Sequence, residues 1–219
     1  MAKSILTSTQ IKILNFLSKK DVFQRNFYFT GGTALAEVYL HHRKSEDLDF
    51  FSETEIDKIS LTSLAKAISK EIQADTQDIQ ESYNRNLLYF NVKDEVIKTE
   101  FTYFPFLQIE NPQIKLGIKT DSLTDIAVNK FFTIYQKPSS RHFIDLYLIL
   151  TTQRYDWDKV EKMARIKFDT VIDPIQLGSQ LIKSETVSQL PHMLIDLPEN
   201  KWRGYFAQKA RDLRSKVVK

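Results

Sequence analysis

The most informative stretch of the sequence runs from Phe27 to Phe51 and reads FYFTGGTALAEVYLHHRKSEDLDFF. Its aromatic start is typical of a buried strand, and Gly31-Gly32 leads into an apolar segment with helical spacing. The stretch ends in Asp47-Leu48-Asp49-Phe50-Phe51. Because side chains alternate between the two faces of a strand, both carboxylates are expected on one face and the apolar residues between them on the other. The pattern therefore predicts a strand, a tight turn, a helix and an acidic strand.

Two carboxylates side by side repel each other, and a divalent cation between them relieves the repulsion. Oxygen ligands favour Mg²⁺ or Mn²⁺ over zinc, and the chain has no cysteine. A helix that begins at Gly31-Gly32 also offers backbone N–H groups to a phosphate. A metal-bound nucleotide fits both features, although a Gly-Gly turn or an Asp-x-Asp pair alone is commonly only structural.

The order of these elements is that of a nucleotidyltransferase core. Residues 31–35 (GGTAL) and 42–50 (HRKSEDLDF) closely resemble the first motif of the AbiEii/AbiGii toxin family of nucleotidyltransferases. That family belongs to the polymerase-beta-like superfamily, and several members are the toxin half of bacterial toxin–antitoxin or phage-abortive systems. The resemblance implies an NTP substrate, a divalent metal and a possible antitoxin partner.

The composition permits this function without demanding it. The 219 residues include 31 Lys and Arg against 28 Asp and Glu, a net charge of +3 that allows an anionic partner such as nucleic acid. Without cysteine, disulfides and thiolate metal sites are excluded, in agreement with a reducing cytoplasm. Neither a signal-peptide pattern nor an apolar run of membrane-spanning length is present, so we expect a cytoplasmic protein with no membrane partner.

Beyond a predicted helix at 56–72, alternating segments at 86–92 and 96–104 flank a short polar turn and predict a hairpin. Glu100 lies among apolar neighbours of the second strand, where an unpaired carboxylate is costly. This is where the superfamily keeps its third metal-site acid, most often Asp, so Glu100 departs from the pattern but keeps the charge. The alternative is that Glu100 pairs with Lys98 or with a neighbouring strand. An edge strand is expected at 114–118.

The second half of the chain predicts helices. A helix from Leu123 to about Gln136 carries Lys130, in the place where the family has a lysine thought to reach the nucleotide phosphates. The next helix begins near Arg141 and resembles the family's last motif, with Arg141 and Asp145 in place and His142 replacing an Asp. Their spacing of four lets Arg141 and Asp145 pair or address one ligand together.

Basic residues from Lys201 to Lys219 could bind RNA phosphates or could simply form a soluble helix surface. Further helices are expected up to about Lys167, from Ile175 to Lys183, and after Pro198.

We therefore expect an α+β fold: a nucleotidyltransferase-like mixed sheet with flanking helices over residues 1–120, then a helical domain over 121–219 that contributes to the cleft. The expected reaction transfers a nucleoside monophosphate from an NTP to an acceptor hydroxyl, with RNA, such as a tRNA end, as the leading acceptor. The metal ligands would be Asp47, Asp49 and Glu100, and the catalytic set would add Lys130 and Asp145. The resemblance assigns nucleotide contacts to Gly31, Gly32, Thr33, Arg43, Ser45, Lys130 and Arg141.

Two alternatives remain at this point. The protein could be a degenerate transferase that acts as an interaction module, which the departures at Glu100 and His142 favour. It could also be a small-molecule nucleotidyltransferase of the antibiotic-modifying type, which shares the core and differs only in its acceptor.

Overall fold

The computed structural model describes residues 4–153 and 155–217, and the chain divides into two compact units. The first contains residues 1–41 and 45–122, and the second contains His42–Lys44 together with the chain from Leu123 onward. The sequence placed the division at residue 120, and it did not indicate that three residues of the stretch from Phe27 to Phe51 pack with the C-terminal helices. Each unit is described by itself below.

The first unit is built on a mixed sheet, seven strands within the described residues, in the order β3-β4-β5-β2-β1-β7-β6. Strand β2 runs parallel to β5, β1 runs parallel to β7, and the other neighbours are antiparallel. This is the mixed sheet with flanking helices that the sequence predicted. The strands are β1 (Tyr28–Thr30), β2 (Leu48–Ser52), β3 (Thr76–Ser82), β4 (Arg85–Val92), β5 (Glu95–Tyr103), β6 (Gln113–Lys115) and β7 (Ile118–Thr120).

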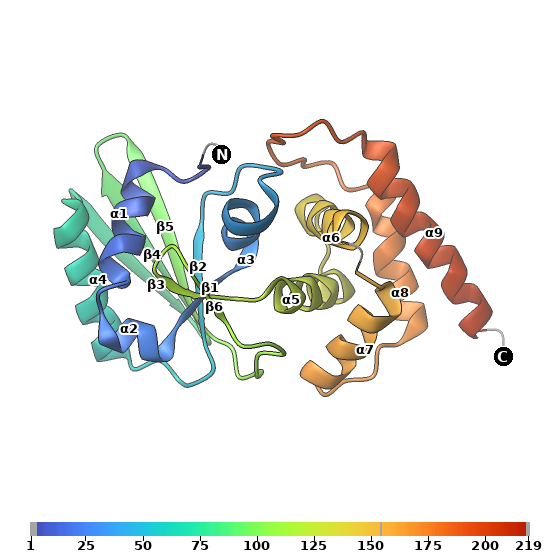
Figure 1. Cartoon of the computed structure of the whole chain (residues 1–219), viewed down its shortest axis with the longest axis horizontal. Coiled ribbons are helices and arrows are strands. Elements are labelled where there is room, and N and C mark those ends of the chain that lie inside the picture. The colour runs from blue at the N-terminus through green and yellow to red at the C-terminus, as the bar shows by residue number, and fades with distance from the viewer. Residues whose placement is uncertain (1–3, 154, 218–219) are drawn as a thin grey trace. The chain divides into compact units, whose positions relative to one another are not determined.

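Helices α1 (Ser8–Leu17), α2 (Asp21–Asn26) and α4 (Lys58–Ile72) cover one face of the sheet (Figure 1). The alternation in β2 puts Leu48 and Phe50 on this face with no solvent exposure, as expected. Phe50 contacts Phe23 and Phe101, with ring centroids 5.1 Å apart in both pairs. The aromatic core leaves the opposite face of β2 and β5 for polar side chains.

Three local features differ from the sequence expectations. The expected edge strand at 114–118 is a hairpin, because Leu116 and Gly117 both have positive φ and turn the chain between β6 and β7. The short helix α2 and strand β3 were not predicted. The helix after the glycine pair begins as α3 (Gly31–Ala34) and continues as the π-helical turn η1 (Leu35–Leu40).

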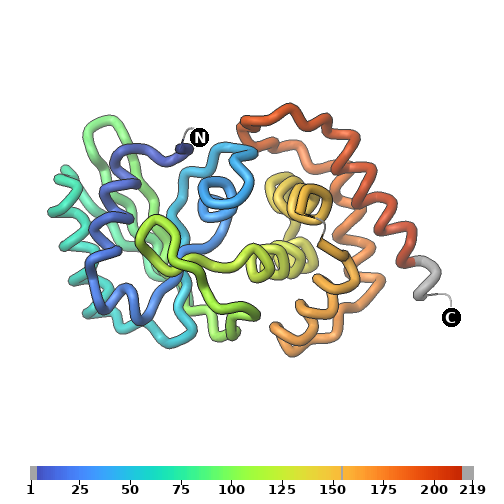
Figure 2. The backbone as a smooth tube through the Cα atoms, viewed as in Figure 1, coloured from blue at the N-terminus to red at the C-terminus, as the bar shows by residue number. Residues whose placement is uncertain are grey.

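The second unit is helical, as the sequence predicted. Its elements are α5 (Leu123–Gln136), α6 (Ser140–Thr152), α7 (Trp157–Lys167), α8 (Pro174–Leu181), η2 (Ile182–Glu185) and α9 (Glu199–Val217). Figure 2 shows α8 and α9, in orange and red, running beside each other. Phe206 of α9 packs on Phe143 at a centroid distance of 4.9 Å, and a buried ion pair joins Lys167 to Asp125 at 2.7 Å.

The segment His42–Lys44 joins this helical unit through backbone pairing. Arg43 forms an antiparallel bridge with Met193, and the N–H of Lys44 donates to the carbonyl of His192. The N–H of Leu194 donates to the carbonyl of His42. The loop that leads to the acidic strand is therefore anchored by residues about 150 positions later in the chain.

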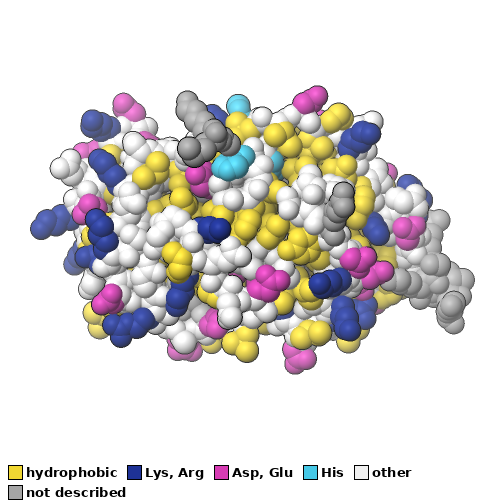
Figure 3. All heavy atoms as spheres, viewed as in Figure 1, with side chains coloured by type: hydrophobic (Ala, Val, Ile, Leu, Met, Phe, Trp, Pro, Cys, Tyr) yellow, Lys and Arg dark blue, Asp and Glu magenta, His cyan; other side chains and the backbone are white. Residues whose placement is uncertain are grey.

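The surface of the described residues carries both signs of charge. Figure 3 shows Lys and Arg side chains interspersed with Asp and Glu on the face in view. Within the same ranges, none of the helices combines the length and the apolar character that crossing a bilayer requires.

Candidate active site

Asp49 and Gly31 are in close contact on the face of the sheet opposite α1 and α4. Asp49 pairs in register with Thr30 on β1, and Gly31 follows directly. A Cβ on Gly31 would lie 2.1 Å from Oδ2 of Asp49, and Gly31 has φ +77°. Only glycine fits both the backbone conformation and the space, so the first glycine of the motif sets how closely the carboxylate approaches the start of α3.

Asp47 lies immediately before β2, and its backbone is fixed by Thr33. The buried Thr33 hydroxyl is 2.8 Å from the hydroxyl of Ser45 and also donates to the carbonyl oxygen of Asp47. The sequence assigned Thr33 and Ser45 to nucleotide contacts, whereas here their hydroxyls bond to each other and shape the loop. Thr30 is the N-cap residue of α3, and its side chain accepts no hydrogen bond from the first backbone N–H groups of the helix.

Glu100 shares this face with Asp49, because the two residues are register partners on the parallel strands β5 and β2. Both carboxylate oxygens of Glu100 accept hydrogen bonds from Arg85 on β4, at 2.7 and 2.5 Å, and Thr102 donates a third at 2.7 Å. Burial alone would raise the pKa of Glu100, but the bonds from Arg85 and Thr102 lower it below its usual value. Glu100 is thus an ionised, nearly buried acid that pairs with a neighbouring strand, which was the alternative expectation for this residue.

Lys98 forms an ion pair with Asp47. Its Nζ lies 2.6 Å from Oδ2 of Asp47. Burial lowers the pKa of Lys98, and the bond to Asp47 together with the charges of Asp49 and Glu100 more than reverses this, so that the pKa is raised. Three carboxylates and two cations therefore occupy one face of three adjacent strands.

The donor set of this face has the chemistry of a hard divalent cation site, since Asp47, Asp49 and Glu100 offer only carboxylate oxygens. Within residues 4–153 and 155–217, however, no three acidic or histidine side chains stand arranged as a metal site. Asp47 bonds to Lys98 and Glu100 bonds to Arg85. The three acids have the right ligand chemistry for the metal, and Asp49 and Glu100 are register partners. Binding of one metal by all three requires Asp47 to separate from Lys98 and Glu100 to separate from Arg85.

The helical unit contains a second charged group, centred on Asp145 of α6. Asp145 is fully buried and accepts from Nε of Arg43 at 2.7 Å and from Nε2 of His42 at 2.8 Å, and Lys130 lies 2.8 Å away. Burial would raise its pKa, but the charges of Lys130 and Arg43 hold it well below the ordinary value. Asp145 therefore orients Lys130 and Arg43 and is itself shielded from solvent.

Arg141 and His142 lie at the start of α6. Arg141 is exposed, and among the described residues it makes no ion pair with Asp145, so the pairing allowed by their spacing does not form. The pKa of His142 falls to about 3, first because the ring is buried and next because Lys130 is close. His142 is thus a neutral ring at the position where the family has an acid.

Sequence reasoning missed Arg85 and saw Lys98 only as a structural partner. The position of Arg85 could have been predicted from the hairpin turn at Lys93 and Asp94. Once Val92 pairs with Glu95, the antiparallel register places Arg85 opposite Thr102. Strand alternation then puts Arg85 on the same face as Glu100.

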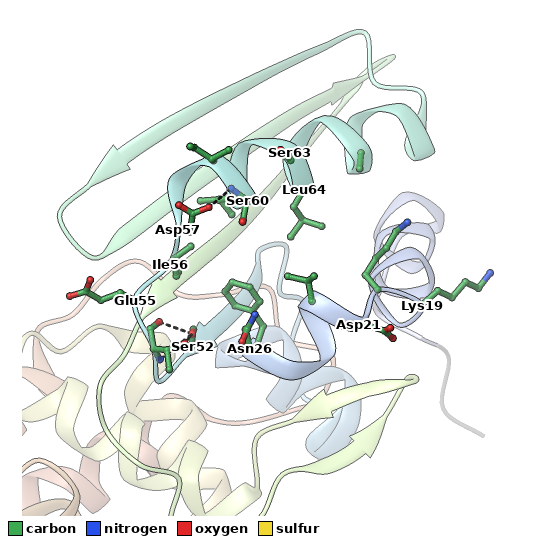
Figure 4. A pocket seen from close by; sticks show the side chains of 17 residues that line it. Lys19, Asp21, Asn26, Ser52, Glu55, Ile56, Asp57, Ser60, Ser63 and Leu64 are labelled. Carbon is green, nitrogen blue, oxygen red and sulfur yellow. Dashed lines mark hydrogen bonds between the residues drawn. The ribbon is translucent and has the colours of Figure 1, made fainter.

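A separate hollow of about 590 Å³ lies on the other face of the sheet (Figure 4). Side chains from Lys19 and Lys20 after α1, from α2, from the chain between Ser52 and Asp57, and from α4 line it. None of the residues assigned to nucleotide or metal contacts borders this hollow.

Two of the basic side chains of α9 make contacts within the helical unit. Arg203 bonds to Glu199 and to the carbonyl of Val187, while Lys209 lies over the ring of Trp157, 5.4 Å from its centroid. The side chains of Arg214, Lys216 and Lys219, which the sequence counted in the same basic group, lie outside the described residues.

Two solved structures resemble this chain in fold. The chain has the fold of a candidate nucleotidyltransferase from H. pylori, with a TM-score of 0.60 at 17% identity over 96% of this chain and 93% of that one. JHP933 from Helicobacter pylori is similar, with a TM-score of 0.58 at 19% identity over 96% and 92% of the two chains. The chain therefore has the fold of these two solved structures.

The family follows from the sequence match. The model of the family described as "Nucleotidyl transferase AbiEii toxin, Type IV TA system" matches residues 15–216. An uncharacterized protein of Aquifex aeolicus (strain VF5), aq_aa25, is 31% identical over 151 residues, which cover 67% of this chain and 68% of the relative. The chain belongs to the AbiEii family of nucleotidyltransferase toxins, as the motif at residues 31–50 indicated.

Proposed function

We propose that this protein is a divalent-metal-dependent enzyme that transfers a nucleoside monophosphate from an NTP to a hydroxyl of RNA in the cytoplasm, and that a cognate antitoxin restrains it. The single observation that carries the proposal is the contact between Asp49 and Gly31. It places an acid of the sheet directly beside the start of α3, where backbone N–H groups would donate to triphosphate oxygens.

Asp47, Asp49 and Glu100 would hold Mg²⁺ or Mn²⁺, which in this class of reaction supplies charge stabilisation for the attacking and leaving oxygens. Gly31 and Gly32 would bind the phosphates through their backbone. Asp49, the acid nearest the glycine turn, would also accept the proton of the attacking hydroxyl.

We further assign Lys130 and Arg43 to neutralising phosphate charge, with Asp145 as the positioning residue that holds both. This departs from a direct catalytic role for Asp145, because the group is fully buried and surrounded by three donors. Arg141, which is exposed, is left as a phosphate contact, whereas Thr33 and Ser45 contribute by shaping the loop before Asp47.

The test is label transfer from each α-³²P NTP to total RNA, with and without Mg²⁺, for the wild type and for Asp49→Ala. We expect transfer by the wild type to require the metal and transfer by the variant to fall by at least about 100-fold, as for loss of a charge-stabilising group. Asp94→Ala, in the exposed turn between β4 and β5, is the matched control and should retain full transfer. Equal transfer by Asp49→Ala would refute the metal assignment.

Two further measurements address the two alternatives. When small-molecule hydroxyl acceptors are offered beside the RNA, label that appears only on them would replace RNA as the acceptor. If calorimetry shows that nucleotide binding is absent or independent of Mg²⁺, the protein is an interaction module rather than an active transferase.

A further inference from the structure

Arg85 and Lys98 lie on the same face of the sheet as Asp49 and Glu100, and the proposed function gives them no role. Each forms an ion pair with one of the outer acids, Arg85 with Glu100 and Lys98 with Asp47. Two unit positive charges thus occupy the same acids that a divalent cation would need.

The two ion pairs differ in exposure. The side chain of Arg85 is 58% exposed against 9% for Glu100, which Thr102 also holds, whereas Lys98 and Asp47 are 28% and 35% exposed. Long cationic side chains can turn toward solvent at small cost, because several bonds can rotate, whereas a carboxylate on a shorter side chain has less reach. Glu100 therefore stays in place, and in both pairs the longer cationic side chain is the partner with the greater reach for an exchange.

Charge arithmetic favours an exchange over simultaneous occupation. Three carboxylates with two cations have a net charge of −1, and adding a divalent metal without moving the cations gives +1. A polyphosphate with three or four negative charges would draw the released ammonium and guanidinium groups toward itself. Arginine in particular matches phosphate oxygens with its planar fork.

We propose that Arg85 and Lys98 are exchange cations, which neutralise Glu100 and Asp47 before the nucleotide binds and turn to the polyphosphate when the metal takes the acids. This inference rests on the proposed function, because it uses the same acids as metal ligands. It adds two nucleotide-binding residues on β4 and β5.

The inference is tested by metal and nucleotide binding rather than by turnover. Mn²⁺ binding is followed by electron paramagnetic resonance without nucleotide, and binding of a non-hydrolysable ATP analogue is followed by calorimetry with Mg²⁺ present. The variants are Lys98→Met and Arg85→Met, with Lys98→Arg as the conservative variant. Lys66→Met, on the exposed side of α4, is the matched control for net charge.

We expect each Met variant to bind Mn²⁺ at least about tenfold more tightly, since a unit charge a few ångströms from a divalent ion is worth about that factor even at the dielectric constant of bulk water. The same variants should bind the analogue about tenfold more weakly, because a phosphate partner is lost. Lys98→Arg should restore both values toward the wild type, and Lys66→Met should change neither.

Mn²⁺ affinity that is unchanged in both Met variants would show that the cations do not compete with the metal, and would overturn the exchange. Tighter Mn²⁺ binding with unchanged affinity for the ATP analogue would overturn the claim that Arg85 and Lys98 bind the polyphosphate. The two residues would then be only structural partners of the acids. If the wild type and every variant bind no Mn²⁺, the proposed metal site fails and the exchange fails with it, so the two failures are distinguishable.

Discussion

Replacing Gly31 by alanine tests the contact on which the proposed site depends. The added methyl group would lie 2.1 Å from Oδ2, 2.9 Å from Cγ and 3.0 Å from Cβ of Asp49. Since ordinary contacts begin near 3.4 Å, the Asp49 carboxylate must move by about 1 Å. The positive φ of Gly31 adds a backbone penalty of about 1–2 kcal/mol for any residue with a Cβ.

Two effects follow, and they can be measured separately. The free energy of unfolding, from urea denaturation, should fall by about 1–3 kcal/mol. Transfer of label from an α-³²P NTP should fall by about 100-fold, the usual effect of a 1 Å misplacement in an active site. Mn²⁺ affinity should fall with it, because the displaced acid is one of the proposed ligands.

The chain offers two matched glycine controls. Gly117 has nearly the same φ, +76°, and a Cβ there would lie 3.1 Å from the Cβ of Ser18 and away from the acids. Gly117→Ala should therefore lose comparable stability and keep its activity. Gly204 lies in α9 with nothing within 4 Å of an added Cβ, so Gly204→Ala should keep activity and gain about 0.5–1 kcal/mol of stability. If Gly31→Ala transfers label as well as Gly117→Ala does, the contact with Asp49 is not part of the active site.

The remaining predictions concern the helical unit. Asp145→Asn should lower the free energy of unfolding by about 3–5 kcal/mol, because Lys130 and Arg43 would be left buried without their anion, and urea denaturation of this variant beside Asp94→Ala checks it. The folded pKa of His142, about 3, lies below its ordinary value of 6.5, so the folded state binds fewer protons and stability decreases as the pH falls through that window. Between pH 7 and pH 5 this residue should cost about 2 kcal/mol, a loss that His142→Asn should remove; an equal loss in both proteins contradicts the assignment. The depressed pKa of Asp145 acts in the same direction at lower pH: its contribution is present above the unfolded value, near 3.9, and disappears as the pH falls further, so Asp145→Asn should flatten the acid limb of the stability curve.

Much of the first unit could be predicted from local pattern. The alternation in residues 47–51 predicted that Leu48 and Phe50 lie in the core, and both are fully buried. The glycine pair predicted a turn into a helix, and α3 begins at Gly31. The helices α5 and α6 follow from apolar periodicity, and the hairpin of β4 and β5 follows from its turn. These elements are specified by residues close together in the chain, which is why a single sequence contains the information.

The partners of the charged residues were decided by the tertiary structure. The sequence allowed Asp145 to pair with Arg141 four positions away, but its partners include Arg43, 102 positions away, because the segment His42–Lys44 is held by backbone bonds to residues 192–194. Likewise, the sequence itself determined that acids line one face of β2 and β5, whereas strand order and burial determined that Arg85 and Lys98 meet them. Periodicity fixes the face on which a side chain lies, but the loss of water around a buried charge makes its partner a property of the whole fold.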